Sequence, residues 1–253
     1  MDIAVVTGAS SGLGEEYVKH IVSLYPELDE IWIIARRKER LEQLAKKITA
    51  VKCRAVACDV TSDVDVQNYE NELKQSGASV KMLINNAGFG KLGYFDEIDA
   101  ATNAAMVRLN CEAVTVMTNI TIPYMDEKSF ILNVCSIASF VPNARMTVYS
   151  ATKAFIKSFS RALREELKRK KINVSAVCPG PMDTEFLAIA DIPEGASKTF
   201  DTLPHINPSK VALGSLKAAA KGRGVYTPHP FYKFYRVLAK LIPHSIMMKL
   251  AKT

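Results

Sequence analysis

The chain has 253 residues, of which 48% are hydrophobic and 23% are charged, so it is long enough to bury a substantial core and has an ordinary globular composition. These values exclude a disordered chain, and no apolar segment is long enough to span a membrane. The net charge is +7, and nine lysines and arginines but no acidic residue follow Asp201, so the excess positive charge belongs to the C-terminal end.

The N-terminus and the cysteines indicate a cytoplasmic protein. Met1 and Asp2 lead directly into a strand-like run, without a basic leader. The five cysteines are odd in number, widely spaced and without a CxxC pair, which is typical of reduced thiols and not of disulfides or metal ligands. The four histidines are equally scattered, so we assign no metal site.

Short β-branched runs alternate with longer amphipathic segments along the chain. This alternation implies right-handed crossovers and a parallel sheet with helices on both faces, so we expect one doubly wound α/β domain of the Rossmann type. No linker divides the chain, so we predict a domain over residues 1–228 and a basic, amphipathic extension of it over 229–253. The seven predicted strands are 3–7, 31–35, 55–58, 80–85, 130–135, 174–178 and 224–227.

A glycine-rich turn, TGASSGLG, follows the first predicted strand at residues 7–14 and leads into a helical pattern. The backbone N–H groups and the positive helix end at such a turn bind anions, and glycine lets a pyrophosphate come close. The spacing G-x-x-x-G-x-G differs from the G-x-G-x-x-G of longer Rossmann dehydrogenases, and a plain tight turn is the alternative. The predicted cofactor contacts of this turn are Gly8, Ser10, Ser11, Gly12, Leu13 and Gly14.

The residues after the second strand favour NADP(H) over NAD(H). Where a NAD-binding protein would place an acidic residue on the adenosine ribose, the sequence reads Ala35-Arg36-Arg37-Lys38. A guanidinium can bind a 2′-phosphate with two hydrogen bonds, whereas a carboxylate would repel it. Arg36 is the better candidate and Arg37 the second; the alternative is a solvated basic helix start.

A tyrosine and a lysine stand four residues apart in the run YSATK, at Tyr149 and Lys153. On a helix this spacing puts both side chains on one face, with Cβ atoms about 5–6 Å apart. A phenol of pKa about 10 is a poor base near neutrality, and a neighbouring ammonium favours its phenolate form. Taken alone, such a pair is more often an ordinary solvated helix face.

Four landmarks occur together and in order: the TGASSGLG turn, NNAG at residues 85–88, Ser136, and the Tyr149–Lys153 pair. With these motifs the chain resembles the short-chain dehydrogenase/reductase family, from the first strand to about Thr227. The resemblance implies hydride transfer between an alcohol and a ketone or aldehyde. Members commonly pair through the helices that carry Asn110 and Tyr149, so a homodimer or homotetramer is expected.

The resemblance also implies roles for four catalytic residues. Tyr149 would be the general acid in reduction and the general base in oxidation, aided by Lys153 and by the positive ring of the oxidised cofactor. Lys153 would also bond the nicotinamide ribose. Ser136 would polarise the substrate oxygen, or only cap the next turn. Asn110 would support a water path to Lys153, or simply bond backbone.

Further cofactor contacts are implied by the same resemblance. Two residues after the third strand would contact the adenine, three residues of NNAG would lie along the cofactor, and three later residues would flank the nicotinamide. These residues are Asp59 and Val60, then Asn86, Ala87 and Gly88, and then Pro179, Gly180 and Thr184.

A long connection over residues 181–208 follows the sixth strand, and insertions at this place in α/β enzymes commonly cover a site. The expected pocket wall is apolar and has no evident charged anchor; it consists of Phe89, Phe186, Leu187 and Ile189 and of part of the C-terminal extension. We therefore expect a moderately large hydrophobic alcohol or carbonyl substrate, such as a hydroxysteroid or a long-chain carbonyl compound.

The C-terminal extension predicts an amphipathic helix that ends at Pro243, and then a second apolar segment with Ser245 as its N-cap. Two interpretations remain open. The helix could lie in a membrane interface with its cations toward anionic lipid. The favoured interpretation is that its apolar side packs on the enzyme, where it either roofs the substrate pocket or buries a subunit contact. The cations Lys233, Arg236 and Lys240 would then lie on the opposite, solvated side. The expected apolar side consists of Phe231, Phe234, Tyr235, Leu238, Leu241 and Ile242.

A second class of function is a non-catalytic NADP sensor that acts through the basic extension. Sensors of this fold usually tolerate loss of the tyrosine and lysine, and both are present here. Nucleic-acid binding is less favoured, because the extension has no recognisable reading motif.

Overall fold

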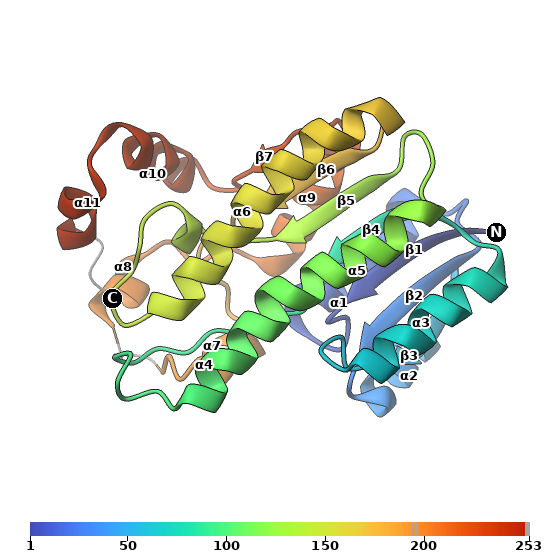
Figure 1. Ribbon diagram of the computed structural model, residues 1–253, viewed down its shortest axis with the longest axis horizontal. Coiled ribbons are helices and arrows are strands. Elements are labelled where there is room, and N and C mark those ends of the chain that lie inside the picture. Colours follow the sequence, from blue (N-terminus) through green and yellow to red (C-terminus); the bar gives the residue numbers. More distant parts are fainter. Residues whose placement is uncertain (194, 196, 251–253) are drawn as a thin grey trace.

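The computed structural model describes residues 1–193, 195 and 197–250. Its centre is a seven-stranded sheet in the order β3-β2-β1-β4-β5-β6-β7, with every neighbouring pair parallel (Figure 1). The doubly wound α/β fold is confirmed, with strand ends shifted by up to three residues. The strands are β1 (Asp2–Thr7), β2 (Glu30–Ala35), β3 (Lys52–Ala57), β4 (Ser79–Asn85), β5 (Phe130–Val134), β6 (Asn173–Val177) and β7 (Val225–Tyr226).

Side chains alternate along each strand between the two faces of the sheet. On β1, Ala4 and Val6 belong to one buried cluster and Ile3 and Val5 to another. Helices cover both clusters, so each face needs apolar side chains. This explains why the central strands are continuous apolar runs and do not alternate with polar residues.

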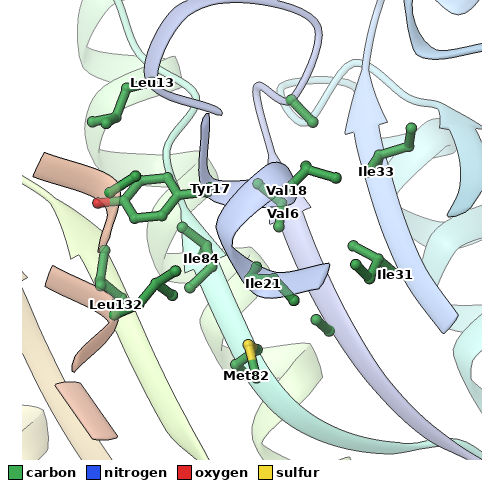
Figure 2. Close-up of a cluster of buried hydrophobic side chains, with 14 of the residues drawn as sticks. Val6, Leu13, Tyr17, Val18, Ile21, Ile31, Ile33, Met82, Ile84 and Leu132 are labelled. Atoms are coloured by element: carbon green, nitrogen blue, oxygen red, sulfur yellow. The ribbon is translucent and has the colours of Figure 1, made fainter. Parts of the chain in front are cut away.

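The first face is covered by α1 (Gly12–Leu24), α2 (Lys38–Lys47) and α9 (Pro208–Ala220). Figure 2 shows Leu13, Tyr17, Val18 and Ile21 of α1 turned toward the strands, at the spacing of one helix face. The Tyr17 hydroxyl pairs with the Ser215 hydroxyl of α9 at 2.9 Å. This bond satisfies a phenol that is otherwise buried in the apolar cluster.

The second face is covered by α3 (Asp63–Ser76), α5 (Ala113–Thr121) and α6 (Thr147–Leu167), which lie in front of the sheet in Figure 1. α4 (Ala100–Val107) continues into α5 through a π-helical turn over Arg108–Glu112. Short 3₁₀ turns lie at Ile122–Tyr124, Ile137–Ser139 and Lys168–Lys170. A buried polar bridge joins β4 to β5, since Asn85 donates to Asn133 at 2.8 Å.

The long connection contains α7 (Glu185–Ile189) and α8 (Lys198–Thr202), and the C-terminal extension forms α10 (Pro230–Leu241) and α11 (His244–Leu250). Ser245 lies inside α11, so the expected N-cap there is wrong. Tyr232 anchors α10, because its ring is fully buried and its hydroxyl donates to the Pro204 carbonyl at 2.7 Å. In the described part of the chain, no helix is both long and apolar enough to cross a bilayer.

Gly180 leaves the space that the Tyr232 ring fills, since a Cβ on Gly180 would lie 2.2 Å from Cε2 of that ring. Gly180→Ala should therefore lower the free energy of unfolding by about 1–3 kcal/mol, because a tightly packed ring must move. Chemical denaturation measures this change. The matched control is Gly224→Ala, whose Cβ would meet only the flexible Arg164 side chain at 3.0 Å. Equal stability of the two variants would contradict the anchoring role of Tyr232.

Candidate active site

The site lies at the carboxyl ends of the strands, where β1 is flanked by β2 on one side and β4 on the other. The connections that follow β1 and β4 leave the sheet toward opposite faces at this point, so a crevice remains between them. A cavity of about 860 Å³ runs from the glycine turn to α10 and α11. All of the predicted catalytic and cofactor residues line this cavity except Gly14 and Asn110, which are both buried.

The glycine turn has a backbone that only glycine adopts easily at two positions, with φ of +65° at Gly8 and +56° at Gly12. A Cβ on Gly14 would lie 2.1 Å from the Gly8 carbonyl oxygen, so the turn packs directly on the start of α1. Ser11 precedes α1, and no side-chain cap of this helix is found among the described residues. The first amides of α1 are thus available to an anion in the cavity.

Thr7 and Asn86 fix the glycine turn against the NNAG segment. The Thr7 hydroxyl accepts from the backbone N–H groups of Asn86 at 3.0 Å and Ala87 at 3.1 Å. In return, the Asn86 side chain donates to the carbonyls of Thr7 and Gly8, each at 3.1 Å. The sequence places Thr7 at the end of the first strand, but it does not predict that the Thr7 hydroxyl binds the NNAG backbone.

Basic residues lie at the far end of the cavity, beyond β2. Arg37 donates through Nη2 to the hydroxyls of Ser10 and Ser11, each at 3.1 Å, and Arg36 lines the same region. Burial raises the pKa of the nearby Asp59, but two hydrogen bonds from Thr61 and the charge of Arg36 outweigh it and leave that pKa lowered. A cradle of backbone amides at one end and guanidinium groups at the other fits a dinucleotide that carries phosphates.

Tyr149 and Lys153 lie on the buried face of α6, one turn apart. The Lys153 ammonium is 5.6 Å from the centre of the Tyr149 ring and donates to the Val134 carbonyl at 2.9 Å. The sequence spacing therefore does place both groups on one face, and that face points into the cavity.

The two pKa values move in the directions that burial dictates. Burial raises the pKa of the Tyr149 phenol well above its ordinary value, against the effect of a hydrogen bond with Ser136. Burial lowers the pKa of the Lys153 ammonium. The expected lowering of the Tyr149 pKa is therefore absent in the described chain, because the loss of hydration outweighs the hydrogen bond with Ser136.

Ser136 and Asn110 both hold local structure. The Ser136 hydroxyl accepts from the Ala138 backbone N–H at 3.1 Å, which caps the turn that follows β5. Asn110 lies in the π-helical turn and bonds both the N–H and the carbonyl of Phe89, at 3.1 and 2.9 Å. π-helical turns are frequent at functional sites. A Cβ on Gly88 would meet Asn110 at 2.9 Å and Lys153 at 3.5 Å, so the three lie together.

The other end of the cavity is apolar. The Phe186 ring of α7 lies 5.7 Å from the Tyr149 ring, between centroids, and the predicted wall residues Phe89, Leu187 and Ile189 also line the cavity. The C-terminal extension contributes a further apolar wall to the same cavity. Its lining residues are Phe231, Tyr232, Tyr235, Leu238, Ile242 and Met247.

Only part of the expected apolar side of α10 packs against the enzyme. Tyr235 and Leu238 pack against the enzyme, but Phe234 is 62% exposed and Leu241 is 75% exposed. Arg236, expected on a solvated face, is half-buried and donates to Thr227 at 3.3 Å. The residue that anchors the helix is Tyr232, which was not on the expected apolar side.

Glu185 was not predicted as part of the site. It begins α7, lines the cavity and forms ion pairs with Arg37 at 3.2 Å and Arg40 at 2.6 Å. The pairing with Arg37 spans 148 residues of sequence. No local pattern indicates a contact of that separation.

Comparisons with known proteins identify the family of this chain. The sequence pattern of the short chain dehydrogenase family matches residues 2–192. The very-long-chain 3-oxoacyl-CoA reductase of Anas platyrhynchos is 30% identical over 257 residues, which cover 98% of this chain and 78% of that protein.

Two solved structures have the same fold over almost the whole chain. A short-chain dehydrogenase from Sphingobium yanoikuyae in complex with NADPH is 27% identical, with a TM-score of 0.80 over 98% of this chain and 95% of that one. The bulky-bulky ketone specific alcohol dehydrogenase from Comamonas testosteroni is also 27% identical, with a TM-score of 0.76 over 98% and 94%. With the glycine turn, NNAG, Ser136 and the Tyr149–Lys153 pair around one cavity, the chain belongs to the short-chain dehydrogenase/reductase family of oxidoreductases.

Proposed function

We propose that this protein is an NADP(H)-dependent oxidoreductase that interconverts a hydrophobic alcohol and the corresponding ketone or aldehyde, with Tyr149 as general acid and base. The observation that carries the proposal is that Tyr149 and Lys153 line the same cavity as the glycine turn, with an apolar compartment beside them. Bound NADP(H) would supply or accept the hydride. The chain itself has to hold the substrate and move one proton.

In the reducing direction, the Tyr149 hydroxyl would donate its proton to the substrate oxygen as negative charge develops there. The Ser136 hydroxyl would donate a hydrogen bond to the same oxygen and stabilise that charge. In the oxidising direction, Tyr149 would take the proton back as a base. Burial keeps the phenol protonated, which suits the donor role in reduction.

Lys153 would give the site its fixed positive charge and would bind the ribose next to the nicotinamide. Its ammonium is held by the Val134 carbonyl, on the strand that leads to Ser136. Asn110 would support this arrangement by holding the Phe89 backbone and by contacting the Gly88 region. Asp59 and Val60 would bind the adenine, and Pro179 and Thr184 would flank the nicotinamide.

The preference for NADP(H) over NAD(H) is supported by Arg36 and Arg37, which line the cavity beyond β2. Arg37 already donates to Ser10 and Ser11 of the glycine turn, and Arg36 remains the second candidate for a 2′-phosphate. Relatives occur in complex with NADPH and in complex with NADH, so the proposed preference rests on these two arginines.

A hydrophobic substrate is supported by the apolar walls that α7, α10 and α11 contribute to the cavity. The Anas platyrhynchos relative is named for a very-long-chain 3-oxoacyl-CoA substrate, and the Comamonas testosteroni relative for bulky ketones. Both names describe carbonyl compounds with large substituents. A hydroxysteroid or a long-chain carbonyl compound would fit the same compartment.

We also infer that the chain forms a homodimer or homotetramer. The support is apolar surface on the helices expected to pair: Val107 of α4 and Phe155 of α6 are exposed, and Phe155 stacks on Phe159. Exposed apolar side chains that gather on a helix face commonly mark an interface.

The exposed side of α10 supports a peripheral membrane contact. Phe234, Val237 and Leu241 are exposed at helical spacing, and Lys233 and Lys240 lie exposed along one border of this stripe. No acidic residue follows Asp201 in the sequence. An apolar stripe with a cationic border is suited to the interface of an anionic bilayer.

Tyr149→Phe should reduce turnover of a carbonyl substrate by about 10²–10⁴-fold, because the proton donor is lost while the ring is kept. NADPH affinity should stay within about twofold, as measured by fluorescence titration. Tyr94→Phe is the matched control, since Tyr94 is exposed and lies outside the cavity lining. Full activity of Tyr149→Phe would refute the role of Tyr149 as the proton donor. NADPH binding by a wild type that turns over no carbonyl compound would favour the non-catalytic sensor.

The two reaction directions should have opposite pH profiles. Reduction needs the protonated phenol, so kcat/KM should stay constant at low pH and fall as pH rises through the pKa of Tyr149. Since burial raises this pKa, the fall is expected above the ordinary tyrosine value of about 10. Oxidation needs the phenolate, so its kcat/KM should rise over the same range. Parallel profiles would contradict a shared role of Tyr149.

Membrane contact is tested by flotation with vesicles that contain phosphatidylserine or only phosphatidylcholine. The full chain should float with the anionic vesicles, and the double variant Phe234→Ser with Leu241→Ser should lose most of this binding. Val64→Ser is the control, because Val64 is an exposed apolar residue of α3, far along the chain from α10. Equal flotation of all three proteins, or none with the wild type, would refute the membrane contact.

A further inference from the structure

Glu185 lies where two distant elements meet at the cavity. It is the first residue of α7, and its carboxylate reaches across to α2 and the residue before it. Oε2 accepts from Arg37 Nη1 at 3.2 Å and Nη2 at 3.3 Å, and Oε1 accepts from Arg40 Nη1 at 2.6 Å. The carboxylate therefore engages both arginines, one through each oxygen.

Arg37 is already engaged through both of its Nη groups in this arrangement. Its Nη2 group is shared among Glu185 and the hydroxyls of Ser10 and Ser11. A 2′-phosphate needs the same kind of donor fork, since guanidinium binds phosphate with two parallel hydrogen bonds. A phosphate also carries about 1.5 to 2 negative charges at neutral pH, so a carboxylate on the same guanidinium would repel it.

We propose that Glu185 is a specificity-determining residue, which competes with the 2′-phosphate of NADP(H) for Arg37 and so limits the preference of this site for NADP(H) over NAD(H). This inference rests on the proposed nucleotide-dependent function. The Arg40 guanidinium provides the alternative partner that keeps the Glu185 carboxylate paired when Arg37 turns to a phosphate. Glu185 thus need not become unpaired when the cofactor binds.

The same contact connects the cofactor end of the cavity with the substrate end. Thr184, which caps α7, lies against the glycine turn, because a Cβ on Gly12 would be 3.3 Å from Thr184 Cβ. Phe186, the next residue after Glu185, packs on the Tyr149 ring. Movement of Glu185 away from Arg37 would therefore shift Phe186, which forms a wall of the proposed substrate compartment.

The test is to measure the dissociation constants of NADPH and NADH for the wild type and for Glu185→Gln, by fluorescence titration without substrate. Glu185→Gln keeps the shape of the side chain but removes its charge. We expect NADPH to bind about three- to tenfold more tightly and NADH to change less than about twofold. The expected range is modest because partly exposed ion pairs are weak.

Glu42→Gln is a matched control. The Glu42 side chain is 49% exposed against 46% for Glu185, and it pairs only loosely with Lys38, at 3.9 Å. It should leave the NADPH to NADH ratio unchanged. The gain in Glu185→Gln should also shrink at high salt, since exposed charges are screened within about 10 Å at 0.1 M.

Three results would overturn the inference. An unchanged ratio in Glu185→Gln would mean that the carboxylate does not compete. Weaker NADPH binding would mean that Glu185 orients Arg37 for the phosphate instead of opposing it. If neither nucleotide binds the wild type, the proposed function itself fails and the inference fails with it, whereas the first two results leave that function intact.

Discussion

The site depends on the parallel pairing of β1 with β4. This pairing sets Val6 opposite Ile84, so the two chains leave the sheet side by side at its carboxyl edge. The glycine turn and the NNAG segment then lie against each other, and Thr7 and Asn86 join them by four hydrogen bonds. The crevice exists because helices α1 and α5 depart to opposite faces of the sheet at this point.

The burial of Tyr149 and Lys153 has opposite consequences for the two groups. The low polarity of the site favours the neutral phenol and disfavours the ammonium. A buried ammonium is tolerated when backbone carbonyls bond it, as the Val134 carbonyl does here. The resulting site is suited to holding a proton until charge develops beside it, more than to holding a phenolate at rest.

The substrate end is built from segments that have no part in the sheet. α7 and α8 come from the connection after β6, and α10 and α11 follow β7. α10 is attached through Tyr232, whose ring fills the space above Gly180. Because these segments pack on a finished core, their side chains can vary without disturbing Ser136, Tyr149 and Lys153. The exposed outer side of α10 is the part of this wall that faces away from the enzyme.

The sequence by itself determined the seven strands, the glycine turn and the shared face of Tyr149 and Lys153. Each depends on periodicity or on spacing within a few residues, which the backbone geometry of strands and helices translates directly into position. The sequence did not determine which side of α10 is buried. A helical wheel locates apolar side chains around an axis, but it carries no information about the surface against which the helix packs.

Tertiary structure alone decided the pKa of Tyr149 and the pairing of Arg37 with Glu185. The first depends on how much water the surrounding elements exclude from the phenol, and neighbours from several helices and loops contribute to that burial. The second joins residues 148 positions apart. No local sequence pattern encodes the pKa of Tyr149 or the ion pair of Arg37 with Glu185, because both arise only when distant segments fold onto the same end of the sheet.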